Sequence, residues 1–442
     1  MKQSTSALVR VVPFYYGWWV AIATAIIILV ASASPLYVFS ALIDPLEDEF
    51  GWSRAAIGAG PSIAAVMVGL TTPVAGYLVD RVGARRLLTA GVVLVGGGNL
   101  VLSQMQALWQ FYIFVAVLAV GIGLAELPVC AVAVAHWFVK RRGRALGVMS
   151  AGAGASGLMV ALAAFLIAPL GWRTGLLIVG TIQLAICIPL ALTVRHRPQE
   201  VGLLPDGEAP ASGEASARSQ PEVVEGEGGH SGMRREEGLT VGQALHTRFF
   251  WLLVAALILT WVGSLAVIVH LIPYLDESGG FTEEGAALIA MGIPFGSLVG
   301  RLGFGWLADY LNKRWLLAVA WILQGLGILI FAAVQSPWQA VIFLVVFTPG
   351  FGGAITVLPA LLAEYFGLRA LGSIQGLLWG AGVLGGFIGP IFAGGVFDAV
   401  DSYRPAFLVM ALASLAAAVL IQVMGRPRAW AAEPAGPLTA ER

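Results

Sequence analysis

The sequence predicts an all-α polytopic membrane protein with twelve transmembrane helices arranged as two six-helix halves. Of its 442 residues, 58% are hydrophobic and 11% are charged, whereas about a quarter of the residues of a typical soluble domain are charged. The apolar residues form runs of about 20 or more, which is the length of helix that crosses a bilayer. This composition excludes a soluble globular protein.

Six predicted spans precede a polar interval and six follow it. The interval, residues 195–246, is rich in Gly, Pro, Ser and Glu and has too few apolar residues to order itself, so we expect most of it to be a flexible linker. It separates an N-terminal half, residues 1–194, from a C-terminal half, residues 247–442. The spans are expected at 17–42, 56–79, 87–106, 109–138, 144–170, 173–194, 248–274, 284–308, 315–334, 337–363, 370–397 and 404–424.

The distribution of Lys and Arg predicts the orientation. With the N-terminus inside, the inner segments hold 21 of the 25 basic residues, the outer loops hold Arg54, Arg173 and Arg404, and Arg301 lies within a span. Basic residues near helix ends are retained on the cytoplasmic side. We therefore expect a multi-pass protein of the cell (inner) membrane with both termini and the linker in the cytoplasm. The first apolar stretch has no small-residue cleavage pattern, so we expect it to be retained as a helix.

An internal repeat supports the division into two halves. The pattern Gly-x-x-x-Asp-Arg-x-Gly-x-Arg-Arg at 76–86 follows the second span, and Gly-x-x-x-Asp recurs at 305–309 after the eighth. The two aspartates, Asp80 and Asp309, are separated by 309 minus 80, or 229, residues. A second match relates 136–147 to 364–372 at nearly the same offset. Self-similarity at a fixed spacing is typical of a duplicated structural unit.

The motif at 76–86 resembles the signature of the major facilitator superfamily. This resemblance implies a six-plus-six carrier with a central cavity, which works by alternating access as a monomer. It also implies that Asp80, Arg81 and Asp309 form a gating latch on the cytoplasmic side; the alternative is that they are ordinary charges at helix ends. Arg301 and the stretch 270–275 are further similar to bacterial monocarboxylate-carrier-like members and to oxalate and formate exchangers.

Arg301 is the first candidate for substrate binding. It lies eight residues before Asp309, or about 12 Å of helix rise, and so falls within the hydrocarbon region. An ionisable group at this depth usually faces the bundle interior and marks a substrate path. Its planar guanidinium matches a carboxylate. The alternative is an arginine that is neutralised by a structural ion pair or by carbonyl groups.

Glu126 is the acidic counterpart on the fourth span, near mid-membrane. A carboxylic acid in low dielectric takes up a proton near neutral pH, which suits proton coupling. We expect Glu126 either to pair with Arg301 in the empty carrier or to bind a cationic group of the substrate. The alternative is a structural role, as a protonated Glu that is hydrogen-bonded inside the bundle. In the first case, protonation of Glu126 would release Arg301 for the substrate anion.

Further polar side chains are candidates for the cavity wall. His270 could shuttle protons, although a helix-end histidine bonded to backbone is the more common case. Ser297 lies one turn before Arg301 and shares its face. Tyr37 and Tyr274 could line the cavity or anchor at the membrane interface.

The eleventh span supplies an amide and an aromatic ring. Gln375 and Trp379 are four residues apart and share a helix face, so they could line the cavity, although packing alone would also explain Trp379. The resemblance implies a second basic residue in this span for dicarboxylate exchange, yet residues 372–397 contain no Lys or Arg. A monocarboxylate is therefore favoured over a dicarboxylate.

The predicted function is secondary transport of a small organic anion with protons. The alternatives are proton-coupled efflux of an amphipathic or drug-like compound and a non-transporting sensor on the same scaffold. No nucleophile-base set, metal-ligand spacing or nucleotide motif occurs in the sequence, so we expect no enzyme activity, no metal and no cofactor. The net charge of zero gives no reason to expect a nucleic-acid partner.

Overall fold

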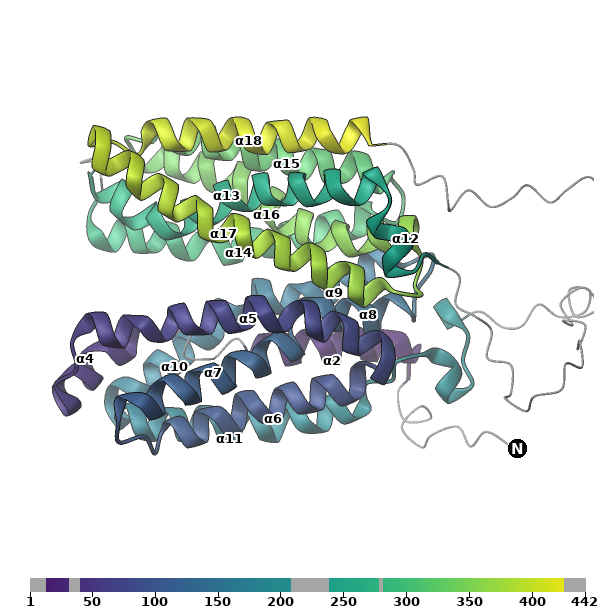
Figure 1. Cartoon of the computed structure of the whole chain (residues 1–442), viewed down its shortest axis with the longest axis horizontal. Helices are drawn as coiled ribbons and strands as arrows, with labels where there is room; N and C mark the ends of the chain where they lie inside the picture. Colours follow the sequence, from purple (N-terminus) through teal and green to yellow (C-terminus); the bar gives the residue numbers. More distant parts are fainter. Residues whose placement is uncertain (1–12, 32–39, 208–237, 278–280, 425–442) are drawn as a thin grey trace, which may run out of the picture.

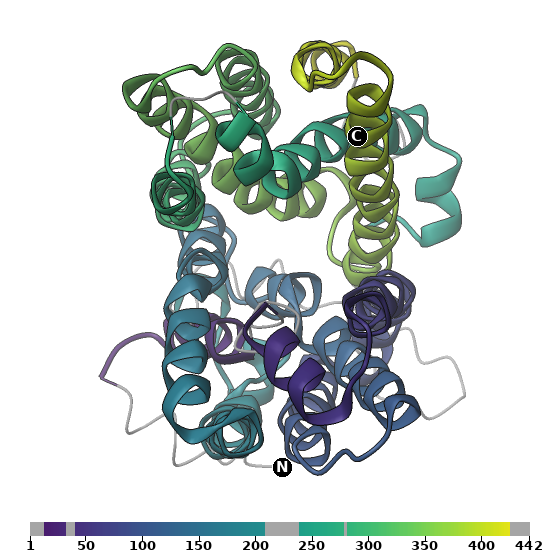
Figure 2. The same ribbon diagram turned by 90° about the vertical axis from the view of Figure 1, so that its left-hand side faces the viewer.

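The computed structural model describes residues 13–31, 40–207, 238–277 and 281–424. Within these ranges the chain is helical apart from short turns and one isolated bridge between Gly238 and Gly367. Figure 1 shows two bundles side by side, one purple to blue and one green to yellow. Figure 2 shows the same two bundles end-on.

Among the described residues, nine helices belong to the N-terminal half and six long helices to the C-terminal half. The first nine are α2 (Tyr16–Ala31), α4 (Ser40–Phe50), α5 (Arg54–Val82), α6 (Ala84–Leu102), α7 (Leu108–Ala125), α8 (Leu127–Ala135), α9 (Arg142–Gly154), α10 (Ser156–Leu170) and α11 (Trp172–Thr193). The six are α13 (Arg248–Glu277), α14 (Glu283–Leu307), α15 (Lys313–Phe331), α16 (Pro337–Phe366), α17 (Leu371–Val400) and α18 (Arg404–Val423).

These helices confirm the predicted twelve-helix architecture. Within the described residues, ten helical segments are long and apolar enough to cross a membrane, and α2 is a shorter apolar helix. The predicted fifth span consists of α9 and α10, which meet end to end at Ala155. The predicted fourth span is divided into α7 and α8 at Glu126.

Local sequence signals fix several helix ends. The side chains of Ser53, Thr282 and Asn312 cap the first turns of α5, α14 and α15 by accepting backbone N–H bonds, as expected for these residue types. Gly83 and Gly367 end α5 and α16 with positive φ angles of 83° and 77°, a conformation that glycine adopts without a steric penalty.

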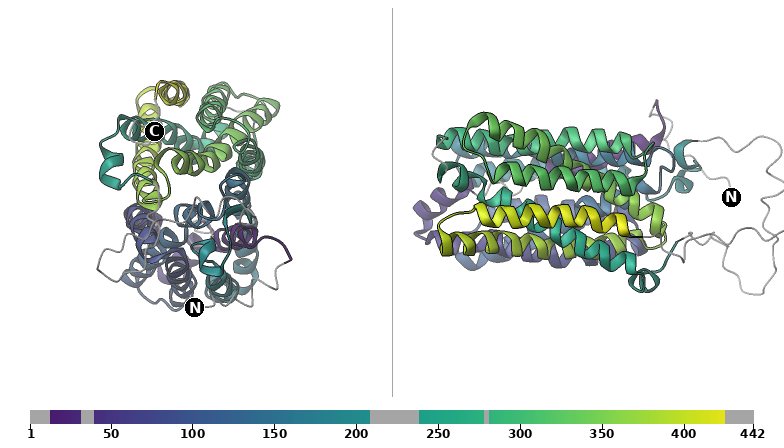
Figure 3. Two further views of the ribbon diagram at one scale, coloured as in Figure 1. Left: turned by 90° about the vertical axis from the view of Figure 1, so that its right-hand side faces the viewer. Right: turned by 90° about the horizontal axis from the view of Figure 1, so that it is seen from above.

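The two halves meet toward one face of the molecule, on the right of Figure 1. We call it the linker face, because it carries residues 196–207 and 238–246 together with the turns at 83, 136–141, 308–312 and 367–370. In the left view of Figure 3 the linker face points toward the viewer, and the right view shows the molecule from above.

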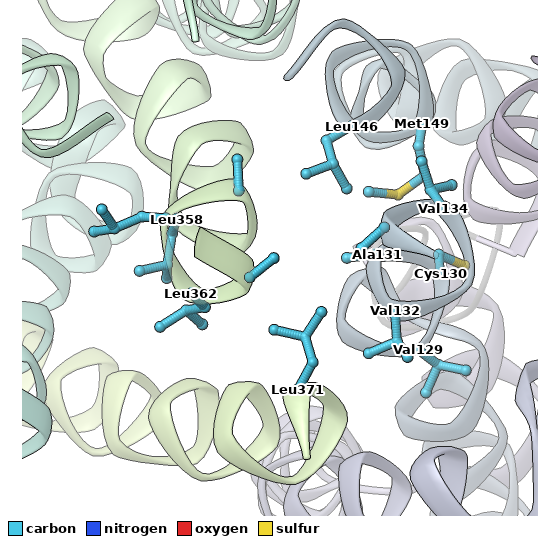
Figure 4. Packing of buried hydrophobic residues seen from close by; sticks show 14 of the residues in the cluster. Val129, Cys130, Ala131, Val132, Val134, Leu146, Met149, Leu358, Leu362 and Leu371 are labelled. Atoms are coloured by element: carbon cyan, nitrogen blue, oxygen red, sulfur yellow. The ribbon is translucent and has the colours of Figure 1, made fainter. Parts of the chain in front are cut away.

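An apolar floor joins the halves near the linker face. Figure 4 shows Val132 of α8 and Leu146 of α9 on one side of it, and Leu358 of α16 and Leu371 of α17 on the other. Each of these side chains is at most 2% exposed, and all belong to one buried cluster that includes residues of both halves. Opening of this contact to water would cost about 25 cal/mol for each Å² of apolar surface that it exposes.

Glycines allow the closest helix approaches. A Cβ atom on Gly76 of α5 would lie 2.2 Å from the carbonyl oxygen of Gly372 on α17, and one on Gly143 of α9 would lie 2.4 Å from that of Gly305 on α14. Within the halves, a Cβ on Gly152 or Gly389 would likewise lie close to a neighbouring backbone, at 2.0 and 2.1 Å. Both of these glycines lie in glycine-rich stretches, of the predicted fifth and eleventh spans respectively.

The two ends of the predicted linker are ordered segments. One contains short 3-10 turns at Pro198–Val201 and Pro205–Gly207, and the other contains the short helix α12 (Val241–Leu245). The interior of the predicted linker, residues 208–237, lies outside the described residues, as do the two termini.

Candidate transport site

Arg301 lies on α14 at the boundary between the two halves. Its side chain is 4% exposed, and its Nη1 donates a hydrogen bond of 3.2 Å to the carbonyl oxygen of Ser150 on α9. The absence of a side chain at Gly154 makes room for it, because a Cβ there would lie 3.3 Å from the Arg301 Cδ. A guanidinium of the C-terminal half thus contacts the backbone of the N-terminal half.

A neighbouring hydroxyl pair also crosses the boundary. Ser150 Oγ and Thr356 Oγ1 of α16 are 2.7 Å apart and both side chains are buried. Sequence reasoning missed this pair, since isolated Ser and Thr residues in apolar helices carry no distinguishing signal. Ser297, one turn before Arg301, is 2% exposed and donates to its own helix at Pro294 O, at 2.8 Å.

Glu126 occupies the break between α7 and α8. Its backbone is extended, with φ −81° and ψ 179°, and its carbonyl oxygen accepts the amide protons of Val129 and Cys130 at 3.1 and 3.2 Å. Pro128 follows the break and lacks an N–H of its own. Sequence reasoning placed Glu126 within a continuous span; Pro128 was the signal for the interruption.

The Glu126 side chain is partly exposed, and its carboxylate has no hydrogen bond or ion pair with any residue that the structure describes. In this conformation Glu126 and Arg301 therefore do not pair with each other. Interrupted helices near mid-membrane typically present polar backbone and side-chain groups to a substrate or ion.

Gln375 and Trp379 lie on the same face of α17, as expected. Gln375 is 1% exposed, and both its Oε1 and its Nε2 lack a hydrogen-bond partner among the described residues. Trp379 makes an edge-to-face contact with Trp261 of α13, with ring centroids 5.5 Å apart. A small cavity of about 20 Å³ lies beside these two rings and is lined also by Thr260 and Ser264.

His270 and Tyr274 lie near the end of the C-terminal half that is opposite the linker face. His270 Nε2 is 3.1 Å from the carbonyl oxygen of Pro390, and its ring lies 4.9 Å from that of Tyr403. Tyr274 packs against Phe331 and Phe407 and borders a cavity of about 440 Å³. Neither side chain contacts Arg301 or Glu126, and Tyr37 lies outside the described residues.

Asp80, the aspartate of the first repeated motif, bonds to the other half. The carboxylate of Asp80, at the end of α5, accepts the backbone N–H of Gly372 at 2.9 Å and both the N–H and the hydroxyl of Ser373 at 2.7 Å. Arg81 takes no part in this contact, because its exposed guanidinium lies over the Tyr77 ring at 4.3 Å.

The second aspartate makes the reciprocal contact. Asp309, just after α14, accepts the backbone N–H groups of Gly143 and Arg144 at 2.7 and 3.4 Å. The Arg144 Nε adds a salt bridge of 2.6 Å. In both cases the carboxylate of one half bonds to the N-terminus of a helix of the other, where it complements the helix dipole. We refer to these two contacts as the latch.

Comparison with known proteins agrees with this architecture. The family model described as Major Facilitator Superfamily matches residues 20–303 and 264–440. The chain is 26% identical to monocarboxylate transporter 12 of Mus musculus over 92% of this chain and 85% of that protein. It is 29% identical to a gallate transporter of Pseudomonas putida over 93% of this chain and 92% of that one.

Two further similarities extend over nearly the whole chain. An oxalate:formate antiporter of Oxalobacter formigenes is 22% identical over 92% of this chain and 93% of its own. A solved structure of the proton:xylose symporter XylE superposes with a TM-score of 0.70 at 14% identity, covering 92% of this chain and 96% of that one. The fold of the two chains is therefore the same.

Proposed function

The chain belongs to the major facilitator superfamily, and we propose that it is a secondary transporter of a small organic anion, a monocarboxylate moved together with protons by alternating access. It is a transporter rather than an enzyme, as its family and its relatives indicate. Three relatives are named as transporters of monocarboxylates, of gallate and of oxalate and formate, all of which are organic anions.

The observation that carries the proposal is the buried position of Arg301 between the two halves. An arginine in the hydrocarbon region is costly and is retained where it has a function. A guanidinium has five N–H donors in a planar fork. Arg301 is thus suited to hold a substrate carboxylate through two parallel hydrogen bonds.

Glu126 is the group proposed to couple proton movement to the anion. It is an acid at a helix break, with no basic partner among the described residues. Its negative charge would repel an anion that enters the same pathway, and protonation removes that charge. Glu126 and Arg301 do not pair in this conformation, so we propose that protonation favours anion entry by neutralising Glu126. Any pairing of Glu126 with Arg301 would belong to another conformation of the cycle.

Gln375, Trp379 and Ser297 complete the proposed binding surface, with Trp261 added from the structure. A buried amide without a partner costs about 1–3 kcal/mol, so its retention favours a role in binding. We propose His270 and Tyr274 as secondary groups near the opening, since neither contacts the central residues.

The closed linker face corresponds to one end state of the proposed cycle. The excess of basic residues supports a cytoplasmic location for this face, and in the proposed cycle the latch described above closes the cytoplasmic side while the other side admits substrate. Asp80 and Asp309 are then gating residues, and Arg81 acts as a flanking charge.

The test is uptake of labelled lactate, pyruvate and larger carboxylates into proteoliposomes under an inward proton gradient. We expect gradient-driven uptake by the natural protein and a loss of roughly 30-fold or more in Arg301→Ala, because a buried charge contact is worth about 2 kcal/mol or more. Arg369→Ala removes an exposed arginine of the linker face and is expected to retain uptake. Absence of uptake of every acid by correctly folded protein would contradict the proposal and favour efflux of an amphipathic compound.

A further inference from the structure

The first ordered end of the linker, residues 195–207, is attached to the loop between α8 and α9. The indole N–H of Trp137 donates to the carbonyl oxygen of Arg195 at 2.9 Å. The Tyr15 hydroxyl lies 2.9 Å from the carbonyl oxygen of Leu204 and 3.0 Å from that of Trp137. The backbone N–H of Asp206 also donates to Trp137 O, at 3.0 Å.

Asp206 holds that loop with its side chain. Its carboxylate accepts the backbone N–H groups of Val139, Lys140 and Arg141 at 2.9, 2.8 and 3.3 Å. Its backbone has a positive φ of 58°, which costs free energy for a residue other than glycine and persists only where the surroundings enforce it. The four hydrogen bonds that Asp206 makes in this position supply that enforcement.

The backbone that Asp206 holds continues, two residues later, into the N–H groups that bind Asp309 of the latch. The N–H groups of residues 139–141 point to Asp206 of the linker, and those of Gly143 and Arg144 point to Asp309 of the other half. Two carboxylates therefore share the N-terminal turn of α9. Residues 139–141, which Asp206 holds, lead directly into the turn that carries the Gly143 and Arg144 N–H groups.

We propose that Asp206 is a positioning residue for the latch, and that the ordered ends of the linker brace the gate as well as tether the halves. Asp206 acts by orienting the N-terminus of α9. The two N–H donors for Asp309 are then preorganised before the linker face closes. Preorganised donors bond more favourably because little conformational entropy is lost on closure.

The other end of the linker makes an equivalent attachment to the C-terminal half. The backbone N–H of Leu239 donates to Phe366 O at 2.8 Å, and Gly238 pairs with Gly367. A Cβ on Gly238 would lie 2.7 Å from that same Phe366 oxygen. This contact precedes by five or six residues the Gly372 and Ser373 groups that bind Asp80. Each linker end thus contacts the loop that leads into a latch-binding helix.

The experiment measures how often the linker face opens. Cys130 and Cys187 are replaced by alanine, and Ala131→Cys introduces a thiol into the apolar floor, where the side chain is 0% exposed. The rate at which a membrane-impermeant maleimide labels this thiol from the linker side is then compared between variants in proteoliposomes. Asp206→Ala is expected to raise the labelling rate about tenfold, which corresponds to about 1.4 kcal/mol.

Two further substitutions separate the carboxylate from the backbone. Asp206→Gly relieves the positive φ angle but removes the acceptor, and is expected to label as fast as Asp206→Ala. Asp206→Asn tolerates the same backbone conformation and keeps one acceptor oxygen, so it is expected to label at an intermediate rate. The control is Asp401→Ala, because Asp401 is the other described non-glycine residue with a positive φ, 54°, and lies at the opposite end of α17; it should leave the rate unchanged.

The inference rests on the proposed latch, so Asp309→Asn is measured in parallel. Faster labelling in Asp309→Asn without any change in Asp206→Ala and Asp206→Gly would overturn the brace while keeping the latch. Unchanged labelling in all of these variants would overturn both. Circular dichroism and thermal unfolding of each variant show whether the fold is retained, and a labelling increase that Asp401→Ala reproduces would contradict a specific role for Asp206.

Discussion

The two halves of the molecule repeat the gate but differ at the centre. Asp80 and Asp309, 229 residues apart, make matching contacts to helix N-termini of the opposite half. At this offset of 229 residues, the position equivalent to Glu126 in the other half is Ile355, and the position equivalent to Arg301 is Thr72. Neither charged group has a charged counterpart in the other half.

The backbone differs in the same way. The helix that carries Glu126 is broken into α7 and α8, whereas its counterpart α16 runs from Pro337 to Phe366 as one helix. A duplicated scaffold can keep its closing contacts, because both halves must close against each other. In the proposed function the central positions bind a ligand without twofold symmetry, so each half would supply a different group: an acid from one and a guanidinium from the other.

The largest expected effect concerns the strengths of the two latch contacts. The Asp309 side chain is 3% exposed and forms a salt bridge with Arg144, whereas the hydrogen bonds of Asp80 to described residues all come from neutral donors. We expect Asp309→Ala to destabilise the closed linker face by about 3 kcal/mol, because it removes the charged acceptor of two backbone N–H groups and of the 34% exposed Arg144 side chain. Asp80→Ala should cost about 1–3 kcal/mol. Distances between spin labels across the linker face measure the opening in each variant. Equal opening in the two variants would contradict a difference in strength between the two latch contacts.

The two glycine contacts between the halves should respond similarly to substitution. Gly76→Ala and Gly143→Ala each place a Cβ within 2.4 Å of a backbone oxygen of the other half, so we expect each to cost about 1–3 kcal/mol through overpacking. Gly97→Ala is the control, because a Cβ there meets nothing within 4 Å. Spin-label distances across the linker face measure this effect as well. An unchanged distance in either alanine variant would contradict the close approach of the helices.

Two buried glutamines give a sharper comparison. In the N-terminal half, Gln183 accepts from Asn99 at 2.7 Å and donates to Val30 O at 3.1 Å, whereas Gln375 of the C-terminal half has neither bond among the described residues. Gln183→Leu should lower the free energy of unfolding by about 1–3 kcal/mol, because it leaves Asn99 without that partner. Gln375→Leu should leave stability unchanged or raise it by about 1 kcal/mol while reducing uptake.

Thermal unfolding and the uptake assay together test this pair of substitutions. A loss of stability in Gln375→Leu with unchanged uptake would indicate that Gln375 is structural. The opposite pattern, retained stability with reduced uptake, is the one that a ligand-binding amide produces.

The smallest expected effect is at the face opposite the linker. On α4, Glu49 bonds to Arg173 at 2.7 Å and to the Trp172 indole at 2.8 Å, and the hydrogen bond from Arg173 lowers the pKa of the Glu49 carboxyl. A lowered folded-state pKa stabilises the fold above the unfolded value of about 4.3, and this contribution is lost as the pH falls through the folded pKa. Because the Glu49 side chain is 41% exposed, we expect less than about 1 kcal/mol.

The corresponding residues of the C-terminal half provide the control. Tyr403 and Arg404 follow Trp172 and Arg173 by 231 positions, and Arg404 borders the larger cavity. Unfolding measured between about pH 6 and pH 3 should show a weaker acid dependence in Glu49→Gln and an unchanged one in Arg404→Gln. An identical pH profile in Glu49→Gln and the natural protein would contradict the stabilising contact.

The sequence predicted the scaffold better than the contacts within it. Hydropathy and the positions of Lys and Arg define long apolar helices, because the bilayer allows few other structures, and the repeat identified Asp80 and Asp309 as equivalent. The break at Glu126 was missed, since apolar periodicity continues through it and Pro128 alone does not distinguish a kink from an interruption.

The partners of the candidate residues were beyond sequence reasoning for a different reason. Arg301 bonds to a backbone carbonyl of α9 and Asp206 bonds to three backbone N–H groups. Backbone groups are the same in every residue, so no residue pattern reveals them. The expected pairing of Glu126 with Arg301 was based on opposite charge alone, and the packing of α14 against α9 directs Arg301 to Ser150 instead in this conformation.

The central claim is that one half supplies the proton site and the other supplies the anion site. Its most direct test is the external pH of weakly buffered proteoliposomes when lactate or pyruvate is added without an imposed gradient, with protein-free liposomes as the control for passive entry of the undissociated acid. We expect alkalinisation with the natural protein, labelled-anion uptake without alkalinisation in Glu126→Gln, and neither in Arg301→Ala. Proton movement with the anion in Glu126→Gln at the rate of the natural protein would contradict the account.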